Sequence, residues 1–423
     1  MRYLALLASL TLTSACRYGF DYDLQEVPLP DPDTEDECGD GLIAATETCD
    51  DRNTEDGDGC SEQCTTERGF RCTGEPSTCD VAVQLQGGTD NIPDTATTIT
   101  VPLSPPVDPG HSVLFFNVTH TGTDPDNSQV TGYLNDAGDA LVFERPNTTP
   151  DVVTIDIAWS VVESSELIVQ RGRTVMTMAG TTENVALPTP VTDTAQAFAL
   201  ATARVPGNNF AWNDWALVRL PDPTTLQIDR TPGTCCDATV DWQVVEFGPD
   251  TDAWVQGGDV QFGETVTAIP VTLPQAAPMD RSFMVFTQNS LTSGIPSAAA
   301  NAIRGEFLSD TELVFERESG AGVIDVSWFV ATWDRIRVQH GTAAFPVDAF
   351  QQIIALDTRF DPDLSVSLLP GMMRQGSTPY TADSRLGLCW FTTRVQNDGT
   401  ELLIRRADAG DVGTASYAVI EFQ

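Results

Sequence analysis

The segment CDDRNTEDGDGCSEQC, residues 49–64, gathers three cysteines and a dense set of carboxylates. Residues of these two types support three kinds of chemistry: a dithiol redox centre, a metal site, or disulfide-stapled loops in an exported chain. The choice depends on the compartment, because cytosolic thiols stay reduced whereas exported cysteines pair. The N-terminal residues bear on that compartment.

The chain begins MRYLALLASLTLTSAC, in which one arginine precedes a short apolar run, residues 4–12. This run is too short to span a bilayer and is typical of a secretory signal, residues 1–15. The stretch Thr13–Cys16 resembles a bacterial lipobox, whose cysteine carries lipid and becomes the mature N-terminus. We therefore expect lipidation of Cys16, membrane attachment through that lipid alone, and an outer-membrane lipoprotein at the cell surface. Plain secretion after signal cleavage is the alternative.

Acidic residues outnumber basic residues by 61 to 22, which gives a formal net charge of −39, and no lysine occurs. So negative a surface repels nucleic acid and anionic lipid, which excludes those partners. The next segment, residues 16–37, is acidic and rich in proline, so it predicts an extended, largely unfolded stalk behind the lipid anchor.

The segment 38–79 contains six cysteines, namely Cys38, Cys49, Cys60, Cys64, Cys72 and Cys79. An exported segment this small cannot bury enough apolar surface to fold alone, so we expect three disulfides among these six residues. Fifteen pairings are open. The segment has no CxxC motif and no histidine, which argues against both a redox site and a zinc site.

The run CGDGLIAATETCDDRNTEDGDGCSEQC resembles the cysteine-rich repeat of myxobacterial and other bacterial surface proteins. It is more distantly similar to Notch-type repeats, which coordinate calcium. The sequence departs from the pattern at Arg52, where the family has glycine. The resemblance implies a calcium site, with oxygen ligands from Asp50, Asp51, Asn53, Asp56 and Asp58. The alternative is that these side chains cap turns between the disulfides.

The rest of the chain contains four repeats. Leucine- and phenylalanine-rich strands end in Arg145, Arg230, Arg317 and Arg406, at spacings of 85, 87 and 89 residues. An aromatic residue recurs in the following strand, and a glutamine two residues before a glycine recurs near the start of each unit. These markers predict units at 81–163, 164–247, 248–333 and 334–423.

Each unit reads as β-structure. Apolar and polar residues alternate over residues 153–161, the loops are rich in Pro, Gly, Asp and Thr, and no helical period appears. The prediction is therefore an all-β chain, with a small disulfide-rich module followed by four tandem antiparallel β-sandwich-like repeats. Whether the units form a row of four or two intimate pairs is open from the sequence.

The recurring Trp, Arg and Glu residues are candidates for a sugar site, but alternation with core aliphatic residues favours structural roles, with Arg and Glu at the rim of each sandwich. Three further cysteines remain. Cys235 and Cys236 form a vicinal disulfide, or one of them bridges Cys389; both alternatives stay open. No GxSxG, HExxH or phosphate-loop motif occurs, so we expect no enzymatic activity.

These features favour a non-catalytic adhesin or ligand-binding protein whose partner is a glycan or a surface protein. The repeat period and the aromatic last strand are faintly similar to H-type lectin domains, which implies glycan binding. Exposed loop tryptophans are then the candidate ligand contacts: Trp212, Trp215, Trp254 and Trp333. The alternative is a structural envelope or appendage component that assembles through apolar flanks. An extracellular hydrolase is less consistent with four similar copies.

Overall fold

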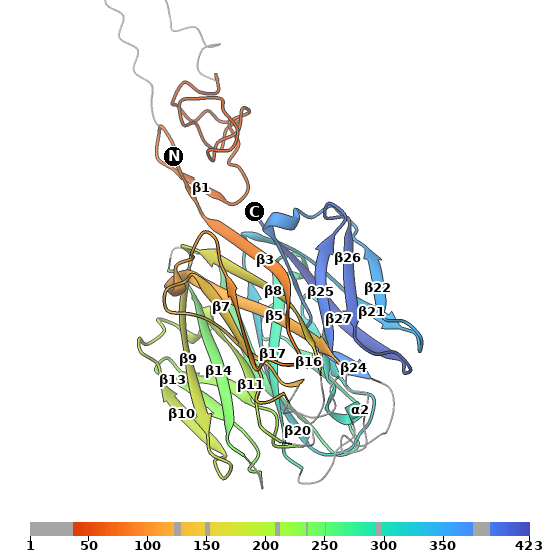
Figure 1. The fold of residues 1–423 in the computed structure, drawn as a ribbon. Helices are drawn as coiled ribbons and strands as arrows, with labels where there is room; N and C mark the ends of the chain where they lie inside the picture. Colours follow the sequence, from red (N-terminus) through yellow and green to blue (C-terminus); the bar gives the residue numbers. More distant parts are fainter. Residues whose placement is uncertain are drawn as a thin grey trace, which may run out of the picture.

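The computed structural model describes residues 37–121, 128–148, 153–207, 212–233, 236–249, 251–292, 298–374 and 390–423. The described chain is almost entirely antiparallel β-structure, with one short helix, α2 (Ala298–Asn301). A disulfide-rich module stands apart from a larger β-body (Figure 1). The all-β prediction is therefore confirmed, whereas the predicted signal, Cys16 and nearly all of the stalk lie outside the described residues.

The N-terminal module holds its chain together with disulfides rather than with a large apolar core. Its six cysteines form three bonds, and the structure selects one of the fifteen possible pairings: Cys38 with Cys64, Cys49 with Cys60, and Cys72 with Cys79. The only strands of the described module form a hairpin, β1 (Phe70–Thr73) and β2 (Thr78–Val81), in which the third pair is directly opposite. The hairpin leads straight into the first strand of the body.

Each repeat contains six strands arranged as two sheets. The first, sixth and third strands form an inner sheet, and the second, fifth and fourth form an outer sheet. In the first repeat these are β3 (Val83–Ile92), β4 (Thr98–Pro102), β5 (Ser112–His120), β6 (Thr131–Leu134), β7 (Ala140–Glu144) and β8 (Ile155–Ser164). The second repeats the plan with β9 (Leu167–Met176), β10 (Thr182–Ala186), β11 (Ala197–Arg204), β12 (Leu217–Asp222), β13 (Thr225–Asp229) and β14 (Ala238–Phe247).

The last two repeats follow the same order. The third comprises β15 (Trp254–Phe262), β16 (Ala268–Thr272), β17 (Ser282–Ser290), β18 (Arg304–Ser309), β19 (Glu312–Glu316) and β20 (Ile324–Thr332). The fourth comprises β21 (Ile336–Phe345), β22 (Gln351–Ala355), β23 (Ser365–Leu368), β25 (Phe391–Gln396), β26 (Glu401–Arg406) and β27 (Gly413–Phe422), with a short extra strand β24 (Met372–Arg374) beside β27.

The four repeats close into a ring rather than forming a row. A 3₁₀ turn precedes the third strand of each repeat: η1 (Pro109–His111), η2 (Thr194–Gln196), η3 (Met279–Arg281) and η4 (Pro362–Leu364). The first strand of each repeat contacts the turn of the repeat before it, so β9 meets η1, β15 meets η2 and β21 meets η3. The ring closes because β3 of the first repeat meets η4 of the fourth.

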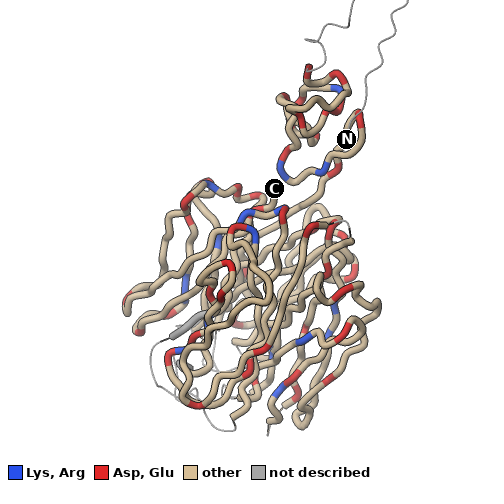
Figure 2. The backbone as a smooth tube through the Cα atoms, turned by 180° about the vertical axis from the view of Figure 1, so that it is seen from behind, with Lys and Arg blue, Asp and Glu red and all other residues tan. Residues whose placement is uncertain are grey.

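An apolar core runs through the ring. One cluster of buried residues draws side chains from all four repeats, and it is richest in the second. Phe198 packs against Phe283 of the next repeat with ring centroids 5.7 Å apart, and Trp333 packs against Phe422 at 5.9 Å. Acidic residues are distributed along the whole backbone and far outnumber the basic ones (Figure 2).

Candidate functional site

The recurring arginines are buried rather than at the rim, so that part of the sequence interpretation was wrong. Arg145, Arg230, Arg317 and Arg406 are at most 3% exposed. Arg317 donates hydrogen bonds to the carbonyl oxygens of Val266, Gly263, Gly322 and Ala300, at 2.7–3.3 Å. Burial lowers the pKa of this guanidinium. Each arginine therefore satisfies loop carbonyls at one end of its sandwich, which a neutral aliphatic residue cannot do.

The other recurring residues are also structural. The glycine of each unit lies opposite the recurring aromatic, and a Cβ on Gly88 would lie 2.7 Å from the ring of Trp159. The recurring glutamine clamps a loop, as Gln86 does by donating to the Pro105 carbonyl at 2.8 Å and accepting from the Ser104 N–H at 3.1 Å. Such roles leave function to positions at which the repeats differ.

The cysteines of the acidic segment 49–64 are structural. Cys49 and Cys60 are fully buried and bond to each other, with an S–S distance of 2.07 Å and Cα atoms 5.9 Å apart. Cys64, the third cysteine of the segment, is also fully buried and bonds to Cys38. Their sulfurs together form the small core of the module. In this structure all three cysteines are engaged in disulfides, so none of them offers a free thiolate to a metal.

The predicted calcium ligands do not assemble into a site that fits the ion. Asp50 is fully buried, and its carboxylate accepts the backbone N–H groups of Gly39, Gly41 and Arg52 at 2.8–2.9 Å. Burial acts to raise the pKa of Asp50, but these N–H groups outweigh it and hold that pKa below its usual range. These three bonds use both carboxylate oxygens, so the Asp50 side chain holds the backbone of its own loops together.

The aspartates among the remaining predicted calcium ligands accept local hydrogen bonds within the module. Asp51 accepts from the Asn53 N–H at 3.3 Å, Asp56 accepts from the Glu62 N–H at 2.9 Å, and Asp58 accepts from the Asn53 side chain at 3.0 Å. Among the described residues, only Cys38, Glu47 and Cys64 bring three metal-type ligand atoms together. Because the two cysteines of this group form a disulfide with each other, their sulfurs are not thiolate ligands.

Cys236 takes part in a disulfide and adopts a left-handed backbone conformation, with a φ of 70°. Cys235 and Cys389, the two partners that the sequence left open, lie outside the described residues. The described cysteines of the N-terminal module all pair with one another, so none of them is the partner of Cys236.

The four candidate tryptophans occupy different environments. Trp333 is only 3% exposed, and its indole N–H donates to Glu166 at 3.2 Å, so its predicted place at an exposed loop tip was wrong. Trp254 lies in strand β15, half-buried against the core of the third repeat. Trp212 is half-buried, with its N–H 3.4 Å from the Pro232 carbonyl. Only Trp215 lines a substantial cavity.

That cavity, the axial cavity, is where all four repeats converge. It has a volume of about 370 Å³ and is lined by the third strands β5, β11, β17 and β23 together with residues that follow them. Its wall is mainly apolar, with Leu114, Phe116, Leu200, Met284 and Leu368. A cavity of this size is within the range of small-molecule sites.

Two tryptophans from different repeats form one side of the axial cavity. Trp215 of the second repeat lies parallel to Trp390 of the fourth, with ring centroids 6.4 Å apart and an interplanar angle of 6°. The indole N–H of Trp215 and the hydroxyl of Thr202 are buried, and neither has a hydrogen-bond partner among the described residues. Both residues line the cavity through other atoms, and the two polar atoms lack the partners that buried donors normally have.

Other polar side chains of the cavity wall are already engaged. Gln129 donates to the Asp214 carbonyl at 2.7 Å and accepts from the Val205 N–H at 2.7 Å. Gln243 makes two hydrogen bonds of 2.9 Å with the backbone of Leu114, which ties the second repeat to the first. The free polar groups are thus few against an apolar wall, which favours an apolar ligand with a single acceptor.

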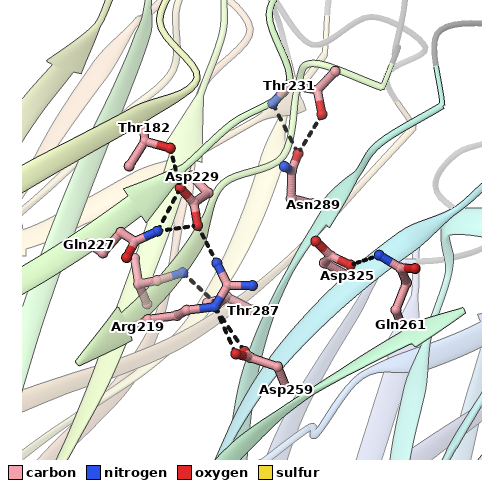
Figure 3. A network of polar contacts seen from close by, with 11 residues as sticks. Thr182, Arg219, Gln227, Asp229, Thr231, Asp259, Gln261, Thr287, Asn289 and Asp325 are labelled. Atoms are coloured by element: carbon pink, nitrogen blue, oxygen red, sulfur yellow. Dashed lines mark hydrogen bonds and ion pairs between the residues drawn. The ribbon is translucent and has the colours of Figure 1, made fainter. Parts of the chain in front are cut away.

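Charged networks join neighbouring repeats outside this cavity. In Figure 3, Arg219 of the second repeat bonds Asp229 within its own sheet and reaches Asp259 of the third repeat at 3.0 Å. Nearby, Asn289 of the third repeat accepts from the backbone N–H of Thr231, at 3.1 Å (Figure 3). Because both ends of these contacts are protein side chains or backbone, we interpret this network as an interface, not as a ligand site.

The comparison with known families covers the N-terminal part of the chain, up to residue 65. The family described as "Domain of unknown function (DUF4215)" matches residues 14–65, a stretch that includes two of the three disulfides. These residues form a cysteine-rich domain of that type. No curated protein matches the chain. No helix among the described residues is long and apolar enough to span a bilayer.

Sequence reasoning identified Trp215 but missed its partner. Trp390, like Trp212 and Trp215, does not recur in the other repeats. This departure from the repeat pattern could have marked Trp390 as a candidate ligand contact. The sequence gives no indication that the third strands of the four repeats converge on one axis. Their convergence follows from ring closure between repeats that are distant in sequence.

Proposed function

We propose that this protein is a non-catalytic cell-surface binding protein that holds an apolar ligand, or an apolar group of a partner, in the axial cavity. The observation that supports this most is the unfilled apolar space at the ring axis, which carries two buried polar atoms without partners among the described residues. Protein cores normally fill such spaces and satisfy such atoms. A ligand with one hydrogen-bond acceptor would do both.

Surface display rests on the predicted lipid at Cys16 and on the likeness of the module to myxobacterial surface repeats. Two of the three histidines hold repeats together, which supports a non-catalytic role. His111 donates to the Leu167 carbonyl at 2.5 Å, and His340 lies 2.9 and 3.0 Å from two carbonyl oxygens, so both rings join repeats together.

The test uses the mature chain, residues 16–423, and the neutral fluorescent probe Prodan, an apolar naphthalene whose ketone oxygen supplies one hydrogen-bond acceptor. We expect saturable, one-to-one binding that Ala201→Phe abolishes by filling the cavity, and that Trp215→Phe weakens because it removes the buried N–H donor. Trp212→Phe is the matched control, since Trp212 does not line the cavity. Binding that survives Ala201→Phe in a folded protein would refute this site.

A glycan array and an outer-membrane extract then distinguish a glycan from a protein partner, and the lectin likeness motivates the first of these. For the anchor, Cys16→Ala should move the protein from the membrane fraction to the medium. Unchanged fractionation would contradict lipidation.

One observation favours the second candidate, a self-assembling envelope component. Three apolar side chains of the fourth repeat, Val347, Phe350 and Ile353, are 46%, 56% and 51% exposed near strand β22. Exposed apolar residues at a sheet edge are suited to association with another copy. Gel filtration of the wild type and of Phe350→Ser tests this: concentration-dependent oligomers that the substitution dissociates would favour assembly.

A further inference from the structure

The third strands of the four repeats place equivalent residues in layers along the axial cavity. The cross-strand partners of the recurring aromatics fix which positions are equivalent. One layer is buried in the core shared by all four repeats and does not line the cavity: Val113, Phe198, Phe283 and Val366. This layer therefore closes the cavity at one end.

The next layer along the strands is the apolar floor of the cavity. Its residues lie two positions further along each strand, and all four line the cavity: Phe115, Leu200, Val285 and Leu368. Two positions beyond them is a third layer that also lines the cavity: Asn117, Thr202, Thr287 and Pro370. A ligand in the cavity thus meets an apolar surface at its inner end and polar side chains one layer further out, which suits an amphipathic molecule.

Asn117 is the residue of the third layer that has hydrogen-bonding capacity left for a ligand. The Thr287 hydroxyl already accepts the Val218 N–H at 2.9 Å, and the Thr202 hydroxyl is buried. Asn117 is half-buried, its side-chain amide makes no hydrogen bond with the described residues, and neither amide atom is fully buried. Its carbonyl can accept and its NH₂ group can donate. Asn117 also borders a second cavity of about 280 Å³ between the fourth and first repeats.

The charges of the cavity wall disfavour an anionic ligand. Asp214 and Asp241 line the cavity, whereas no arginine or histidine of the described residues does. Arg173 binds Asp241 at 2.7 and 2.8 Å and so belongs to that carboxylate. A carboxylate ligand would be buried without a cation of its own, which costs free energy, so a neutral head group is preferred.

We propose that the axial cavity selects neutral amphiphiles that carry an amide group. The amide of the ligand pairs with the amide of Asn117, since each supplies one donor and one acceptor to the other. The apolar chain of the ligand lies on the floor formed by the second layer. This inference rests on the function proposed for the cavity and names the chemical class of its ligand.

The experiment is displacement of Prodan from the mature chain by three ligands with the same chain: octanamide, methyl octanoate and octanoate. The Prodan affinity of each variant is measured first. We expect octanamide to compete at about tenfold lower concentration than methyl octanoate, which lacks the N–H donors, and octanoate to compete least. Asn117→Leu should abolish the preference for the amide over the ester. The matched control, Asn184→Leu, changes an exposed residue of β10 and should preserve that preference.

The outcomes separate this inference from the function on which it rests. If neither Prodan nor any of the three ligands binds, both are overturned. If Prodan binds but the three ligands compete equally, or if the preference survives Asn117→Leu, only the amide assignment is overturned. Ala201→Phe, which fills the axial cavity, should abolish octanamide binding together with Prodan binding. Octanamide binding that persists in folded Ala201→Phe would place the amide site elsewhere and overturn the inference.

Discussion

Arg171 and His340 occupy the same position in the second and fourth repeats, and each reaches a backbone carbonyl at the start of the third strand of the repeat before it. Arg171 donates to the Ser112 carbonyl at 2.5 Å, and His340 lies 2.9 Å from the Ser282 carbonyl. The two alternate interfaces, where this position is Gly257 or Gly87, lack such a donor. The four interfaces of the ring therefore differ in whether a side chain at this position donates to the preceding repeat.

His340 makes the third interface sensitive to pH. Burial lowers its pKa from the ordinary value of 6.5, although Glu306 and the carbonyls of Ser282 and Met279 act in the opposite direction. A lowered folded-state pKa means that the unfolded chain takes up the proton first, so stability falls as pH drops below 6.5. Urea unfolding at about pH 7 and about pH 5 should show this loss, and His340→Gln should reduce it. An equal loss in the variant would contradict the assignment.

The recurring buried arginine should be essential for the stability of its sandwich. Arg406 donates to the carbonyls of Ala349 and Pro346 at 2.7 and 2.8 Å. Arg406→Met should lower the free energy of unfolding by about 3 kcal/mol, because buried carbonyls lose charged donors. Arg405→Met is the control: this neighbour in β26 is exposed, so its loss should cost at most about 0.5 kcal/mol. Similar effects of both would contradict the role of burial.

Asp50 should organise the N-terminal module without calcium. Asp50→Asn should destabilise the module by about 2 kcal/mol, because a buried carboxylate that accepts several N–H groups is replaced by a neutral amide. Faster hydrogen exchange at Gly39, Gly41 and Arg52 would report it, with the exposed Asp58→Asn as control. Because the pKa of Asp50 is lowered, its contribution is full above the ordinary value of 3.8 and is lost as pH falls further. If adding a chelator lowered the thermal midpoint of unfolding, the prediction of a calcium site would be supported instead.

Glu421 should attach the module to the ring. This buried carboxylate pairs with Arg68 of the module at 3.0 Å and with Arg337 of β21 at 2.7 Å. Glu421→Gln should speed tryptic cleavage after Arg68, because the hairpin then loses a charged contact with the body. The matched control is Glu163→Gln: the equivalent residue of the first repeat accepts the Asp108 N–H and has no arginine partner among the described residues. Unchanged cleavage in Glu421→Gln would show that other contacts hold the module.

Much of the fold could be predicted from spacing, because one set of structural residues recurs in every repeat. The arginine on a strand face beside Leu141 and Phe143 was correctly placed in alternation with the core. Its burial was missed because a charged residue is seldom fully buried without a partner, and its partners are loop carbonyls that no side-chain pattern reveals. Trp333 was misplaced for a related reason: the sequence shows a turn, but not the ring neighbours that cover it.

The module shows the same division between what spacing reveals and what it hides. Six clustered cysteines in a short exported segment predicted three disulfides, and three disulfides form. That Cys49 bonds Cys60 rather than any other cysteine could not be predicted, because pairing depends on which backbone loops approach one another, and a list of spacings does not contain that information.

The candidate sites were harder to predict, since they depend on contacts between repeats. The axial cavity needs four strands from distant parts of the chain, and such convergence in space leaves no periodic signal. The useful clues are residues that do not recur in the other repeats, namely Trp215 and Trp390.

Closure also changes how the body should come apart. In an open row of repeats, each end unit has one neighbour, so the ends open first and the array unfolds in steps. In this ring every repeat has two neighbours, so opening any one of them breaks two interfaces at once. The four repeats are therefore expected to unfold in a single concerted transition, with no frayed terminal unit from which unfolding can spread.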